Sequence, residues 1–174
     1  VKLWKASPHT PTLISFATRL GLPEAMDEAI ALVKNPKTSA SERRALTKLL
    51  SERRSGNALE LLLGQFKTEK NSSRRIELMT ALQRFENNSV GTALLARYKG
   101  MPQRERETAQ NILSSRANWS LEFIQAIDAG KIKREDVRPA TVLAMQSHKQ
   151  KAIDVLVKKH WGQLQQSTKA KQQR

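Results

Sequence analysis

The chain has no cysteine among its 174 residues. Disulfide bridges, a cysteine nucleophile, thiolate zinc sites and covalent attachment of c-type haem are therefore excluded within this sequence. The sequence also lacks a glycine-rich phosphate loop, a serine nucleophile elbow and a dinucleotide-binding fingerprint. Its histidines, His9, His148 and His160, are not spaced as a helical pair of zinc ligands, and the last two are interpreted as surface or capping residues. These absences predict a chain that is not an enzyme and holds no metal or cofactor.

Glycine, proline and aromatic residues are scarce, with seven glycines, six prolines and 5% aromatics. Runs of Val, Ile, Thr and Tyr typical of strands are absent, whereas the helix formers Ala and Leu are abundant. No apolar run approaches the roughly 18 residues that a transmembrane helix needs, so we expect no insertion into a membrane. The composition therefore predicts an all-α fold.

An apolar helical pattern recurs along the chain at a nearly constant interval. Leu50, Leu82 and Leu113 each close an apolar stripe, at intervals of 32 and 31 residues. Seven residues before these leucines stand three arginines: Arg43, Arg75 and Arg106. Helix pairs that recur at this spacing bury their apolar faces only by stacking on their neighbours. We therefore predict an all-α, HEAT-like α-α superhelix, that is, a helical repeat solenoid of about four helix pairs with a short C-terminal cap.

Breaks in the pattern divide the chain into four segments. We expect a lead-in over residues 1–9, HEAT-like helical repeats over 10–129, a C-terminal helical cap over 130–164 and a basic flexible tail over 165–174. Because the chain begins at a valine and not at a methionine, we expect a mature product or a piece of a longer protein.

Local signals predict where the helices begin and end. Thr10 and either Ser39 or Ser41 are expected to cap helix N-termini, Pro23 to open a helix, and Gly21 to end one. The first helix is expected to bury Leu13, Ile14, Phe16, Ala17 and Leu20. The brief helix after Pro139 is expected to bury Val142, Leu143 and Met145. The aromatics at apolar-stripe positions, which we assign to the core, are Phe66, Tyr98, Trp119 and Phe123, whereas Trp4 receives no core position.

The formal net charge is +15, which implies attraction to an anionic partner. The basic residues form short clusters along the chain, a distribution typical of solvated helical faces. The three phased arginines could bind phosphate or carboxylate groups, but we favour salt bridges to the adjacent repeat. The candidate anion- or partner-binding residues are Arg43, Arg74, Arg75, Arg106, Lys131 and Arg134.

The stretch from Asn118 to Gly162 adds a resemblance to a known family. The matching elements, in chain order, are Ser115–Arg116 before Trp119, Ala126–Ile127 with Ala129–Gly130–Lys131–Ile132, then Asp136, Gln146–Ser147–His148 and Trp161–Gly162. They resemble a segment of large secreted proteins of planctomycetes and verrucomicrobia that are called membrane-bound dehydrogenases. The resemblance covers roughly the last third of the chain, and the preceding repeats agree with it in kind.

In that family a β-propeller like those of PQQ-dependent sugar dehydrogenases precedes a HEAT-like helical region, and a C-terminal c-type haem domain follows. This chain contains no C-x-x-C-H motif. The resemblance therefore implies the helical region alone, which would position the propeller relative to the haem domain or dock an acidic partner. It also implies a periplasmic or secreted location. We expect a monomer whose partners are neighbouring domains of a parent polypeptide, another protein or an acidic polymer.

Two alternatives stay open at this point. The first is a cytoplasmic, basic HEAT-like module that binds nucleic acid through phosphate contacts, for which a continuous basic stripe would be the sign. The second is a HEAT-like DNA glycosylase. It would need an acidic residue beside an aromatic in a cleft, and only Glu122 or Asp128 near Trp119 could supply it.

Overall fold

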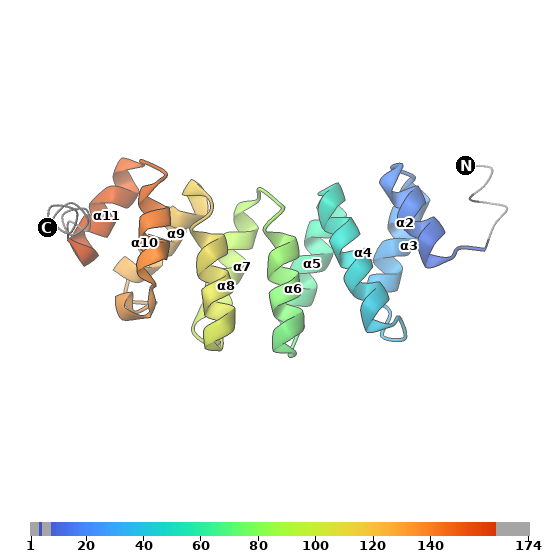
Figure 1. The fold of residues 1–174 in the computed structure, drawn as a ribbon, viewed down its shortest axis with the longest axis horizontal. Coiled ribbons are helices and arrows are strands. Elements are labelled where there is room, and N and C mark those ends of the chain that lie inside the picture. Colours follow the sequence, from blue (N-terminus) through green and yellow to red (C-terminus); the bar gives the residue numbers. More distant parts are fainter. Residues whose placement is uncertain (1–3, 5–7, 163–174) are drawn as a thin grey trace, which may run out of the picture. The chain divides into compact units, whose positions relative to one another are not determined.

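The computed structural model describes residue 4 and residues 8–162. The rest of the predicted lead-in and the predicted flexible tail lie outside this part. Every regular element within it is a helix (Figure 1). The chain divides into two compact units, Val1–Glu86 and Asn87–Arg174.

The first unit contains helices that pack on their neighbours in the chain. Its helices are α2 (Pro11–Arg19), α3 (Pro23–Lys34), α4 (Ala40–Arg53), α5 (Gly56–Thr68) and α6 (Ser72–Leu82). Helix α4 contacts the helices on both sides of it, and it also packs on α2 and α6. Packing of each first helix on the first helix of the next pair is how a stack of helical hairpins buries a continuous core.

The second unit repeats this arrangement. Its elements are α7 (Asn88–Tyr98), α8 (Gln103–Leu113), α9 (Ala117–Asp128), the short 3-10 helix η1 (Arg134–Asp136), α10 (Pro139–Gln146) and α11 (Lys151–Trp161). Helix α9 packs on α7, α8 and α11, so the segment predicted as a C-terminal cap is part of the same unit as the helices before it. The predicted all-α helical-repeat fold is confirmed within each unit.

Local capping explains where the helices begin and end. The Thr10 side chain accepts a hydrogen bond from the Leu13 N–H at 3.3 Å. Ser39, one of the two predicted serines, forms a capping box with Glu42, in which each side chain accepts from the other residue's N–H at 3.2 Å. After α2 the chain turns at Gly21 with φ of +85°, a conformation that favours glycine. These predicted boundaries are confirmed.

The core contains the aromatics that the sequence assigned to it: Phe66, Tyr98, Trp119 and Phe123 are all buried. Trp4, which had no core assignment, is also buried, and its ring stacks on the ring of His9 with a centroid distance of 3.8 Å. His9 in turn bonds the Glu28 carboxylate at 2.6 Å, which ties it to α3. Trp4 is therefore a core residue of the first unit.

Two predicted stripes are partly wrong. Phe16 and Leu20 of the α2 segment are 57% and 71% exposed, and Leu143 of α10 is 54% exposed. Helix α2 buries Ile14 and Ala17. Only one face of a helix meets the core, so the apolar side chains outside that face stay exposed. In α10, likewise, the neighbours of Leu143 in the stripe are buried while Leu143 itself faces outward.

Candidate interaction surfaces

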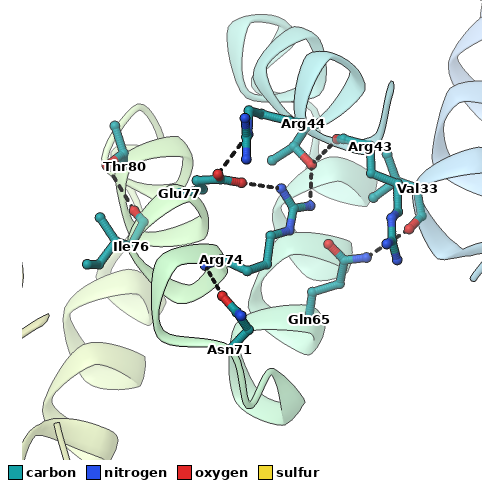
Figure 2. Close-up of polar contacts among 10 residues, drawn as sticks. Val33, Arg43, Arg44, Gln65, Asn71, Arg74, Ile76, Glu77 and Thr80 are labelled. Carbon is teal, nitrogen blue, oxygen red and sulfur yellow. Dashed lines mark hydrogen bonds and ion pairs between the residues drawn. The ribbon is translucent and has the colours of Figure 1, made fainter. Parts of the chain in front are cut away.

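Arg74 joins α6 to α4 in the first unit (Figure 2). Its Nη2 donates to the Thr47 hydroxyl at 2.7 Å, and its Nη1 pairs with the Glu77 carboxylate at 3.0 Å. The other oxygen of Glu77 pairs with Arg44 of α4 at 2.7 Å. Two arginines and one carboxylate thus connect neighbouring helix pairs. The Arg74 guanidinium is mostly buried by these contacts and is not presented as an open anion site.

Two of the phased arginines lie in the first turns of first helices, Arg43 in α4 and Arg75 in α6. Arg75 Nη1 donates to the backbone carbonyls of Glu69 and Lys70, at 3.2 and 2.6 Å, directly after α5. Glu69 is the C-cap residue of α5, so this contact satisfies one of the carbonyls that the end of a helix leaves without a partner. Figure 2 also draws Arg43, whose side chain overlaps Val33 and Gln65 in that view. The position of the Arg75 guanidinium suits a cation because the C-terminus of a helix carries a partial negative charge.

In the second unit the third phased arginine bridges two elements. Arg106 of α8 pairs with Asp136 of η1 at 3.5 Å. Arg134 pairs with its neighbour Glu135 at 2.8 Å and donates to the backbone carbonyl of His160 at 3.0 Å, which joins η1 to the end of α11. The hydrogen bond from Arg134 also holds the pKa of the Glu135 carboxyl below its usual value. Salt bridging between repeats is therefore observed for Arg106.

Gln110 is a buried polar hub that the sequence interpretation missed. Its Nε2 donates to the Tyr98 hydroxyl and to the Asp136 carbonyl, both at 2.7 Å. Its Oε1 accepts from the Arg138 N–H at 3.1 Å and from the Thr141 hydroxyl at 3.0 Å. One side chain therefore links α7, α8, η1 and α10. The signal in the sequence is a glutamine inside the apolar stripe of α8, where a buried polar group needs partners.

The histidines have structural partners. The ring of His148 bonds the Ser114 carbonyl at 2.9 Å, at the end of α8, as expected for a capping residue. His160 and Lys159 both contact one oxygen of Asp128, at 2.8 and 2.5 Å, which joins α11 to α9. The hydrogen bond from Lys159, and then that from His160, lowers the pKa of the Asp128 carboxyl.

The residues that a DNA glycosylase would need do not form a catalytic cleft. Trp119 is fully buried, and its indole N–H donates to the Asn87 carbonyl at 3.2 Å. Glu122 accepts from the Thr92 hydroxyl at 3.3 Å, and Asp128 is paired as described above. A buried indole offers no face on which a base can stack, so this geometry does not support the glycosylase alternative.

Each unit contains a groove between the second helices of neighbouring pairs. The groove of the first unit lies between α3 and α5 and measures about 610 Å³. The groove of the second unit lies between α7 and α9 and measures about 810 Å³. Lys131, the remaining candidate residue, lies at this second groove together with Lys99. Lys99 lies 32 residues after Lys67, so the repeat interval could have identified it as a further candidate residue.

Within residues 8–162 and Trp4, no group of three His, Asp or Glu side chains is arranged to hold a metal ion. In the same part of the chain no helix has the length and apolar character needed to cross a membrane. No protein-family model, curated protein or solved structure matches this chain.

Proposed function

We propose that this chain is a non-catalytic helical-repeat module that acts as a spacer and docks an acidic partner. The observation that carries the proposal is that its candidate binding residues make contacts within their own unit. Arg74, Arg106 and Arg134 each bind a group on another element of their own unit, and they do not converge on one site. Side chains used in this way stiffen a scaffold. The net charge of +15 then supplies attraction to an acidic surface.

The resemblance of the C-terminal third to the helical region of membrane-bound dehydrogenases gives this proposal its finer form. In that form the module belongs to a larger extracytoplasmic redox protein. It positions a propeller domain relative to a c-type haem domain, and all redox chemistry belongs to those domains.

Binding of nucleic acid is the competing proposal, and the charges of the first unit's groove disfavour it. A surface that tracks phosphates needs an uninterrupted row of cations. In the first unit the groove carries the carboxylates of Asp27 and Glu60 beside the single cation of Lys34. A phosphate backbone laid there would meet like charges. Mixed charge of this kind suits a protein partner better.

Zero-length cross-linking with a carbodiimide tests the proposal on the natural polypeptide that contains this chain. We expect isopeptide bonds from lysines of the chain to aspartates or glutamates of another domain or protein. The yield of these cross-links should fall as salt is raised, because salt screens the attraction between exposed charges that brings the partners together. Cross-links confined to this chain under all salt conditions would contradict docking to an acidic partner. A sample without carbodiimide serves as the control.

A further inference from the structure

The groove between α7 and α9 has the features of a peptide-binding surface. Leu95 and Ala126 form its partly exposed apolar lining, and the buried Ile132 lies beneath one end. Ala129 and Gly130 follow α9 at that end, and open space surrounds the position where a Cβ of Gly130 would lie. Small residues keep the groove open, so the side chain of a partner can reach the apolar lining.

The charges around this groove are separated along it. Lys99 and Lys131 are exposed and lie where α7 and α9 end. Neither lysine forms an ion pair with any residue that the structure describes. Glu122, the one carboxylate in the lining, is engaged by the Thr92 hydroxyl at 3.3 Å. The groove therefore carries two cations against one carboxylate, and both cations lie at the same end.

The corresponding groove of the first unit has the opposite balance. There Asp27 and Glu60 outnumber Lys34, around an apolar lining that includes Leu61. The two grooves form between the same kinds of helices, so their difference lies in charge and not in architecture. Charge complementarity decides which partner a groove accepts. Binding at the first groove can therefore serve as a control for binding at the second groove in the same chain.

We propose that the groove between α7 and α9 binds a segment of a partner protein that carries apolar side chains directly beside carboxylates. The apolar side chains lie against Leu95 and Ala126, and the carboxylates pair with Lys99 and Lys131. This inference rests on the proposed docking function and assigns that function to one surface. A lysine near a helix C-terminus also stabilises the helix, so the experiment must separate binding from folding.

Amide chemical shifts of the isotope-labelled full chain locate the binding surface. The probe is a short synthetic peptide with a leucine pair followed by a run of glutamates. A second peptide has lysines in place of the glutamates. We expect the acidic peptide to shift residues of the α7–α9 groove and to leave the α3–α5 groove unchanged. Shifts spread over outer faces, or shifts of both grooves by both peptides, would overturn the assignment.

Paired charge reversals provide the quantitative test. The groove variant is Lys99→Glu with Lys131→Glu, and the control is Lys151→Glu with Lys158→Glu on the exposed surface of α11. Each pair changes the net charge from +15 to +11, because each Lys→Glu change removes two charges. We expect about tenfold weaker binding of the acidic peptide for the groove variant and less than about twofold for the control. Equal losses would mean that only bulk charge attracts the peptide and would overturn the proposal.

A third variant keeps the lysines and fills the groove. Ala129→Trp places a large side chain at an exposed position, so the core of the unit is left intact. We expect this variant to weaken binding as strongly as the charge reversal while its thermal unfolding stays unchanged. Undiminished binding would place the peptide elsewhere. The proposed docking function would then survive if cross-links to another domain persisted, whereas the groove would not.

Discussion

Replacement of Gln110 with leucine should strongly destabilise the second unit. The change removes the shared hydrogen-bond partner of the hydroxyls of Tyr98 and Thr141, two residues that are each 2% exposed. The Arg138 N–H and the Asp136 carbonyl also lose a hydrogen bond. A buried polar group left without a partner costs about 1–3 kcal/mol, and the apolar leucine recovers part of that cost. We therefore expect a loss of about 3 kcal/mol in the free energy of unfolding.

Urea denaturation followed by tryptophan fluorescence measures this loss, because Trp119 lies in the core of the same unit. The matched control is Gln125→Leu, which changes an exposed glutamine of α9 and should alter the free energy by less than about 0.5 kcal/mol. If Gln110→Leu costs less than about 1 kcal/mol, or no more than the control, then the hydrogen-bonded hub does not hold the unit together.

Three further predictions follow from single contacts. Gly91→Ala should lower the free energy of unfolding by about 1–3 kcal/mol, because the added Cβ would lie 2.9 Å from Cδ1 of the buried Trp119. The control, Gly64→Ala, meets nothing within 4 Å and should raise the free energy of unfolding by up to about 1 kcal/mol. Urea unfolding of both variants measures the two changes. Burial raises the pKa of Tyr98 above 10.0. Above that pH the native state therefore binds more protons than the unfolded state, and the free energy of unfolding falls as pH rises through the native pKa. Because Tyr98 is the only tyrosine, phenolate absorbance should stay low past pH 10 until the chain unfolds, and ordinary titration at 10.0 would contradict its burial. The hydrogen bonds from Lys159 and His160 that lower the pKa of Asp128 stabilise the fold above about pH 3.8, and this stabilisation is lost as pH falls through the native pKa. Asp128→Asn should therefore make the free energy of unfolding depend less on pH in the acid range.

Helix ends could be predicted from the sequence because their causes are local. Thr10 and Ser39 cap helices through bonds to residues three positions away, and Gly21 supplies the backbone conformation that ends α2. The repeat interval predicted the stacking, since helices with one apolar face have few other ways to bury it.

The contacts between helices could not be predicted from the same patterns. Which face of α2 meets α3 and α4 depends on the packed unit, so Phe16 and Leu20 were wrongly assigned to the core. The interval between Arg43, Arg75 and Arg106 was visible, but the sequence does not show that Arg75 reaches the backbone after α5 or that Arg106 pairs with Asp136 of η1. The groove between α7 and α9 likewise depends on side chains from two helices brought together by folding.

Binding of fluorescent single- and double-stranded oligonucleotides across a salt series tests the central claim most directly. If the charge of +15 serves to dock a protein partner, oligonucleotides should bind only at low salt, with a dissociation constant weaker than about 10 μM at physiological ionic strength. Sub-micromolar binding at physiological salt, with a steep log–log salt slope, would show a surface that tracks phosphates. That result would contradict the account of this chain as a module that docks proteins.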